Sequence, residues 1–172
     1  MHPSDWLEEY FEKVAHSSTQ GREAVEYVRA QKIRVGLRRT RKSAGAFWTL
    51  EGRIFLNSVH YTQETALENP RAWTLFVHEA RHLQQGILTA LSIFGELDAW
   101  QVEFNLYKII TNKPLRPILE DLLCLPLNMD RDNLRLARKL MMHYAGKGYG
   151  ANWLPLYPIH KEIKYWVMPG QT

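Results

Sequence analysis

The sequence contains one cysteine, Cys124, so the chain has no second thiol with which to close an internal disulfide. A reducing compartment fits this lack. Because Cys124 lies in the apolar run from Leu122 to Leu125, we expect its thiol to be a buried structural group in the core.

The sequence also lacks a long apolar run. The longest, Ile87 to Phe94, is well short of the about 20 residues that cross a bilayer, and it contains Thr89 and Ser92. The N-terminal residues do not combine a basic region with an apolar core, as a secretory signal would. We therefore predict a soluble, cytoplasmic protein with no membrane partner.

Neither sign of charge dominates, since 22 Lys and Arg stand against 18 Asp and Glu, a net charge of +4. A hydrophobic content of 45% with 23% charged residues is typical of a globular protein and excludes a disordered chain. The length of 172 residues predicts one domain over 1–172, with parts at 1–31, 32–111 and 112–172.

Much of the small positive excess comes from one segment, which contains Arg34, Arg38, Arg39, Arg41 and Lys42. Such a cluster either forms a solvated hairpin loop or meets an anionic partner. No aromatic residue interleaves with these cations along the chain, and no nucleic-acid motif is present. The pattern favours the solvated loop and argues against nucleic acid as a partner.

The distinctive feature is HExxH, formed by His78, Glu79 and His82. Four residues along an α-helix advance about 6 Å and return to nearly the same side, so both imidazoles can reach one metal ion. Zn²⁺ accepts neutral imidazole nitrogens, and a catalytic zinc site keeps one position for water. Glu79 is placed to take a proton from that water and pass it to a leaving amine.

The surroundings of the motif predict the helix that it requires. Asn69 is the expected N-cap, Pro70 the first helical residue and Gly86 the C-cap, which gives a helix of about 16 residues.

If the chain reverses near Gly86, a second helix runs back antiparallel to the first. At 1.5 Å of rise per residue, Glu96 then reaches the level of the two histidines, whereas Glu103 overshoots by about 10 Å. Asp98 points about 200° away from Glu96. Glu96 is the predicted third ligand, with Glu103 in reserve.

The remaining patterns predict a mostly helical α+β fold with a small antiparallel sheet before the HExxH helix. Helices are expected at Ser4 to Ala15, Thr19 to Ala30, Leu88 or Thr89 to Ile110 or Thr111, Arg116 to Leu123, and from the cap Asp130 to Ala145. Strands are expected at Ile33 to Leu37, Ala44 to Leu50 and Ile54 to Asn57, with one more in Ile159 to Val167 of the wrapping tail Gly148 to Thr172.

These motifs resemble those of the gluzincin metallopeptidases, the thermolysin-like branch of the zincins. The matching residues are His78 to His82 and Glu96-Leu97-Asp98-Ala99, which is similar to the family's second motif, Glu-x-x-Ala. The likeness covers about Ile33 to Thr111. It implies a zincin-like fold, zinc held by His78, His82 and Glu96, and Glu79 as general base and acid. It also implies that an extended peptide pairs with a sheet edge, at the strand Ala44 to Leu50 or its neighbour.

The sequence departs from the family at Trp100, where many relatives have an aspartate that holds a ligand histidine by its other nitrogen. Glu103, Asp98 or a backbone carbonyl are the candidates for that task. No motif selects an oxyanion donor. The downstream side chains are His143, Tyr144, Tyr149, Tyr157 and His160. Tyr144 is expected in the core, and the two histidines are expected at the surface or as hydrogen-bonded structural groups.

The sequence thus predicts a zinc-dependent peptidase that hydrolyses peptide bonds of a peptide or protein substrate through a metal-bound water activated by Glu79. The alternative is a metal-stabilised zincin-like scaffold or binding protein with little or no hydrolytic activity. In a third hypothesis the chain is a basic nucleic-acid module in which HExxH is accidental.

Overall fold

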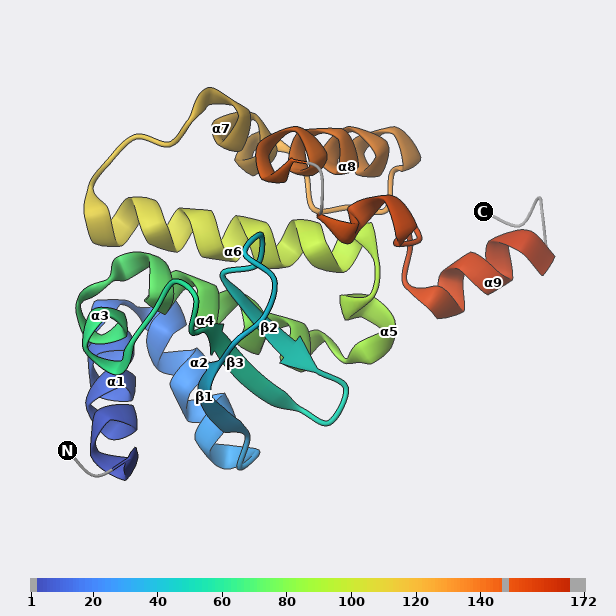
Figure 1. Ribbon diagram of the computed structural model, residues 1–172. Helices are drawn as coiled ribbons and strands as arrows, with labels where there is room; N and C mark the ends of the chain where they lie inside the picture. Colours follow the sequence, from blue (N-terminus) through green and yellow to red (C-terminus); the bar gives the residue numbers. More distant parts are fainter. Residues whose placement is uncertain (1–2, 147–148, 168–172) are drawn as a thin grey trace.

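In the computed structural model, which describes residues 3–146 and 149–167, a small sheet and several helices surround two long helices, α4 and α6 (Figure 1). The helices before the sheet are α1 (Pro3–Ser17) and α2 (Thr19–Ala30). After the sheet come α3 (Gln63–Glu68), α4 (Pro70–Gln85), α5 (Ile87–Ala90), α6 (Ile93–Thr111), α7 (Pro117–Cys124), α8 (Arg131–Ala145), the 3-10 helix η1 (Gly150–Trp153) and α9 (Ile159–Val167).

Helix α4 has the bounds that the sequence predicted, for the predicted reasons. The Asn69 side chain accepts a hydrogen bond from the backbone N–H of Arg71, Pro70 occupies the first turn, and Gly86 ends the helix at a φ of 75°. Helix α2 also matches its predicted range. The small helix α3 was not predicted, although Thr62 and Thr65 cap it reciprocally.

The sheet is mixed, not antiparallel, so this part of the prediction was wrong. Strands β1 (Arg34–Arg38), β2 (Ala46–Thr49) and β3 (Arg53–Asn57) lie in the order β1-β3-β2. A turn joins β2 to β3 as an antiparallel hairpin, whereas the loop 39–45 carries the chain across the sheet end, so β1 pairs with β3 in parallel. Alternation of apolar residues reveals a strand and its buried face, but not its neighbour or direction.

The expected helix from Leu88 or Thr89 is divided into α5 and α6, because Ser92 caps a new helix through the Gly95 N–H. Cys124 is exposed, not buried, because it ends α7 about 200° around the helix from the buried Leu122.

Residues Ile159–Val167 form helix α9 instead of the predicted strand. The Pro158 carbonyl accepts from the N–H groups of Lys161 and Glu162, which starts the helix directly after a proline. The rest of the predicted tail, at 147–148 and 168–172, lies outside the described residues.

Two apolar clusters form the interior, and α6 contributes to both. One cluster joins α1, α2, the inner face of the sheet, α4 and Leu106 near the end of α6. The other joins Ile93, Leu97 and Trp100 of the first half of α6 to α7, α8 and the segment 151–156. The HExxH residues of α4 therefore face the part of α6 where the two clusters meet. Within the described residues, no helix is long and apolar enough to span a membrane.

Candidate metal centre

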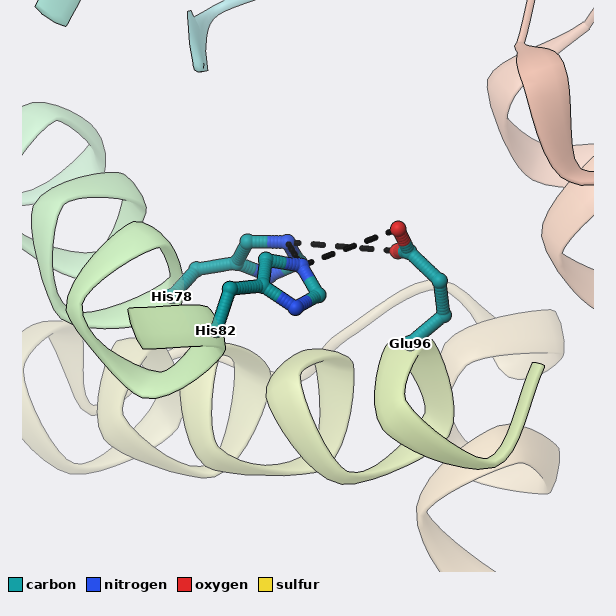
Figure 2. A group of neighbouring side chains, drawn as sticks. All are labelled: His78, His82 and Glu96. Atoms are coloured by element: carbon teal, nitrogen blue, oxygen red, sulfur yellow. Dashed lines mark hydrogen bonds and ion pairs between the residues drawn. The ribbon is translucent and has the colours of Figure 1, made fainter. Parts of the chain in front are cut away.

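The side chains of His78, His82 and Glu96 converge in the space between α4 and α6 (Figure 2). The two Nε2 atoms lie 3.0 Å apart. Glu96 approaches from α6, with Oε1 3.6 Å from His82 Nε2 and Oε2 4.0 Å from His78 Nε2. The structure thus brings together the three side chains that the sequence selected, because α6 runs back along α4.

The spacing of these atoms suits a small divalent cation. Two ligands of a tetrahedral zinc ion, each at about 2.1 Å from it, are about 3.4 Å apart. The observed separations are 3.0 Å between the two nitrogens and 3.6 and 4.0 Å from the nitrogens to different oxygens of Glu96, and with one ligand atom per residue all three atoms lie within 4.8 Å of one another. Two imidazole nitrogens and one carboxylate oxygen are also a donor set of catalytic zinc sites, so the residues present fit the ion.

Glu103 reaches the other side of His78 and does not join the three converging groups. Its Oε2 lies 2.7 Å from His78 Nδ1, and its Oε1 forms an ion pair with Arg71 of α4. Glu103 lies further along α6 than Glu96, as helix geometry predicted. It therefore contacts the Nδ1 side of the His78 ring, away from the converging Nε2 atoms. Of the candidates for holding that ring, the structure selects Glu103.

His82 is held by a different group, Gln85, one turn further along α4. Gln85 Oε1 lies 3.3 Å from His82 Nδ1. The amide of Gln85 donates to the Gly95 carbonyl at 2.9 Å and to Asp98 Oδ2 at 2.6 Å, and Arg81 donates from Nε to the same Asp98 oxygen. Asp98 thus fixes the orientation of the Gln85 amide and reaches His82 only through it.

Trp100, the residue that departs from the family pattern, supports the carboxylate and not a histidine. Its indole N–H donates to Glu96 Oε2 at 3.2 Å and to the Tyr149 hydroxyl at 2.7 Å. The Tyr149 hydroxyl in turn donates to Glu96 Oε2. Two donors therefore orient one oxygen of Glu96.

Burial gives the ionisable groups unusual pKa values. Burial by itself lowers the pKa of His78, but the nearby carboxylates, Glu103 above all, raise it to about 9. Burial and the charge of His78 lower the pKa of His82. The histidine pair therefore carries one positive charge near neutral pH, and a divalent cation would replace that proton.

Glu79, the predicted proton carrier, is 6% exposed and faces the same region. Burial raises the pKa of Glu79 to about 7, against the charge of His78 and a backbone hydrogen bond from Trp48, which lower it. A carboxyl group with this pKa accepts and releases protons at neutral pH.

A cavity of about 540 Å³ lies against these groups. Its walls come from the loop 40–45, β2, α4, α6 and the region around Tyr144 and Tyr149. Of the five downstream candidates for a donor, only Tyr144 and Tyr149 line it, while His143 and His160 are exposed as expected. Tyr144 packs against Trp100 and Phe104 at the border of the second apolar cluster, but it is half-buried and not fully in the core as expected.

Sequence reasoning did not identify Arg71 or Gln85, and it named Tyr149 only as one of five candidate donors, not as a partner of Glu96. The first two carry a detectable signal, because Arg71 precedes His78 by seven residues on one helix face and Gln85 follows His82 by three. Tyr149 carries none, since a segment 53 residues beyond Glu96 reaches it only through the tertiary fold.

No protein-family model matches the sequence, and neither the curated proteins nor the solved structures contain a significant match. The functional interpretation therefore rests on the site itself.

Proposed function

We propose that this chain is a zinc-dependent peptidase of the gluzincin type, acting on peptides or proteins. One observation carries the proposal: His78, His82 and Glu96 point their ligand atoms at one another within 4.8 Å, beside the buried Glu79 and an adjoining cavity. A metal site that only stabilises the fold would need neither a neighbouring proton carrier nor an adjoining cavity.

Zinc held by His78, His82 and Glu96 would supply a Lewis acid, which would polarise the scissile carbonyl and make water more acidic. Glu79 takes a proton from water as the water oxygen attacks the carbonyl carbon. It then delivers that proton to the nitrogen as the C–N bond breaks.

The free edge of β2 is the proposed substrate-binding strand. In the order β1-β3-β2 the central strand β3 is paired on both sides, so only β1 and β2 have an open edge. Residues 44–48, which include most of β2, line the cavity, whereas β1 does not. An extended peptide pairing with β2 would pass directly over the two histidines.

Tyr149 is the proposed oxyanion donor. Its hydroxyl lies at Glu96 and is therefore within the group that would surround the scissile carbonyl. Tyr144 contacts Trp100 and Phe104 through its ring and is better explained as packing.

The test is turnover of a diverse peptide library by the zinc-loaded protein, compared with Glu79→Gln. We expect Glu79→Gln to keep its zinc and to lose turnover by a factor of about 100 or more, because general acid–base catalysis contributes on that scale. Glu26→Gln, which changes an exposed glutamate of α2, is the matched control and should keep full turnover. Full turnover by Glu79→Gln contradicts the proposed chemistry.

A metal-stabilised scaffold is the second candidate, and one observation favours it. Trp100 and Tyr149 both donate to Glu96 Oε2, which holds the carboxylate firmly and leaves it less free to rearrange during a reaction. In that case zinc removal would lower the melting temperature, while the zinc-loaded protein would cleave none of the library.

A further inference from the structure

The sheet has one face turned toward the helices and a second, outer face that no helix of the described chain covers (Figure 1). Directly paired residues share a face, and successive residues alternate. Ala46, Ile54 and Leu56 are buried on the inner side. The register therefore assigns Phe47, Phe55, Arg34, Arg38 and Arg53 to the other side, which we call the outer sheet face.

Two aromatic rings lie next to each other in the outer sheet face. Phe47 and Phe55 are directly paired across β2 and β3, with ring centroids 5.4 Å apart and planes 32° apart. Both are half-buried. The Arg38 guanidinium lies 5.6 Å from the centre of the Phe55 ring. The outer sheet face thus offers flat apolar surface flanked by positive charge.

The charge around these rings is almost entirely positive. Residues 32–53 contain seven Lys and Arg and one acid, Glu51, which pairs with Arg53 at 3.0 Å. Among the described residues, no carboxylate forms an ion pair with Arg34, Arg38, Arg39, Arg41 or Lys42. These five cations therefore remain available to an anionic partner.

A buried asparagine fixes the backbone of the loop that carries part of this charge. Asn57, at the end of β3, accepts from the Thr40 N–H through its side-chain oxygen and donates to the carbonyls of Arg41 and Ala44. His60 Nε2 contacts the Lys42 carbonyl at 2.7 Å. The basic loop 39–45 is thus fixed beside the sheet, which lowers the entropy lost when a partner binds.

We propose that the outer sheet face, together with the basic loop, binds single-stranded nucleic acid. The cations match the phosphates of such a strand, and the rings match the faces of its unpaired bases. A strand of five residues spans about 16 Å, which accommodates roughly two or three nucleotides. Duplex DNA keeps its bases stacked on one another, so it cannot use the rings.

The interleaving of rings and cations arises only in three dimensions. Phe47 and Phe55 are separated from the cluster 34–42 along the chain, and the sheet register brings them beside Arg38. The absence of interleaved aromatics in the sequence, which argued against nucleic acid, therefore does not hold for the folded surface.

The experiment is fluorescence anisotropy with labelled oligothymidylate of about 12 nucleotides, the site size of a small single-strand-binding surface. Binding is measured from about 50 mM to about 200 mM salt, with a chelator present, for the native protein and for Glu79→Gln. We expect salt-dependent binding in both, weaker for a duplex of equal length. The result is therefore independent of the proposed peptidase activity.

Two variants test the surface itself. Removing two phosphate contacts with Arg34→Ala/Arg38→Ala should weaken binding and reduce the slope of log affinity against log salt by about 1.4. Phe55→Leu keeps apolar bulk and removes the ring, so it should weaken single-strand binding about tenfold. The control Arg135→Ala/Lys139→Ala removes the same charge from the exposed side of α8 and should bind normally.

Absence of binding at the lowest salt, or unchanged binding by Arg34→Ala/Arg38→Ala, overturns the proposal. Equal affinity for a polyglutamate peptide, together with normal binding by Phe55→Leu, also overturns it in favour of an acidic peptide partner. Circular dichroism of each variant separates loss of binding from loss of folding, and the arginine variants decide the matter should Phe55→Leu unfold.

Discussion

At the scale of single residues, the two candidate ligand histidines are oriented by unlike partners. His78 has a carboxylate, Glu103, which is itself paired with Arg71, whereas His82 has the neutral amide of Gln85. A carboxylate behind a ligand imidazole makes the ring a stronger donor and fixes its orientation. His78 should therefore depend more strongly on its supporting group.

We expect Glu103→Gln to lower zinc affinity about 10- to 100-fold, because glutamine keeps the size of the side chain and removes its charge. Competition with a fluorescent zinc chelator measures this change. Asp132→Asn, at an exposed position of α8, is the matched control. Unchanged zinc affinity in folded Glu103→Gln would show that Glu103 does not support His78 in this way.

At the scale of elements, the position of Glu96 depends on how closely the start of α6 approaches α5. Gly95 lies at this contact, where an added Cβ would be 2.1 Å from the Thr89 carbonyl oxygen. The same residue accepts from the Gln85 amide through its own carbonyl. A side chain at position 95 would therefore move the start of α6, and Glu96 with it.

Gly95→Ala should destabilise the fold by about 1–3 kcal/mol, the usual cost of inserting a methyl group into a packed contact. The substitution should also weaken zinc binding, because Glu96 is the next residue and would be displaced together with position 95. Urea unfolding and zinc competition measure the two effects. Gly150→Ala, where an added Cβ meets nothing within 4 Å, is the control. A Gly95→Ala variant as stable as this control would contradict the close contact.

Strand β2 has two different neighbours on its two sides. Trp48 faces inward, 6.0 Å from the His82 ring, while Phe47 packs against Phe55 on the outer sheet face. The proposed peptide edge is backbone, whereas the proposed nucleic-acid surface is made of side chains. Substitutions of Phe55, Arg34 or Arg38, which do not line the cavity, should therefore leave peptide turnover intact.

At the scale of the whole molecule, the candidate metal centre joins helices that belong to different parts of the interior. The ligands of α4 lie next to the first apolar cluster, while Glu96 lies in the half of α6 that packs into the second. An ion bound by both helices would hold the two parts together. Binding to the folded state alone stabilises it by mass action.

We predict that zinc at about 100 times its Kd stabilises the protein by about 2.7 kcal/mol and raises the melting temperature by about 5–10 °C. Differential scanning calorimetry with zinc or with chelator measures the shift. His82→Ala should abolish it, and Glu26→Gln should retain it. Equal melting temperatures with and without zinc would show that no ion joins α4 and α6.

The sequence determined the local features of this protein. The caps of α4 and the spacing of His78 and His82 follow from helix geometry, which depends on neighbours along the chain. Glu96 was selected on the assumption of one helix after Gly86, whereas the break between α5 and α6 sets its actual position. Only the tertiary structure decided the parallel pairing of β1, the exposure of Cys124, the contact of Tyr149 with Glu96 and the grouping of Phe47 and Phe55 with Arg38. These features join residues that are distant in sequence or depend on which face a neighbouring element covers. Periodicity along one segment carries no information about either.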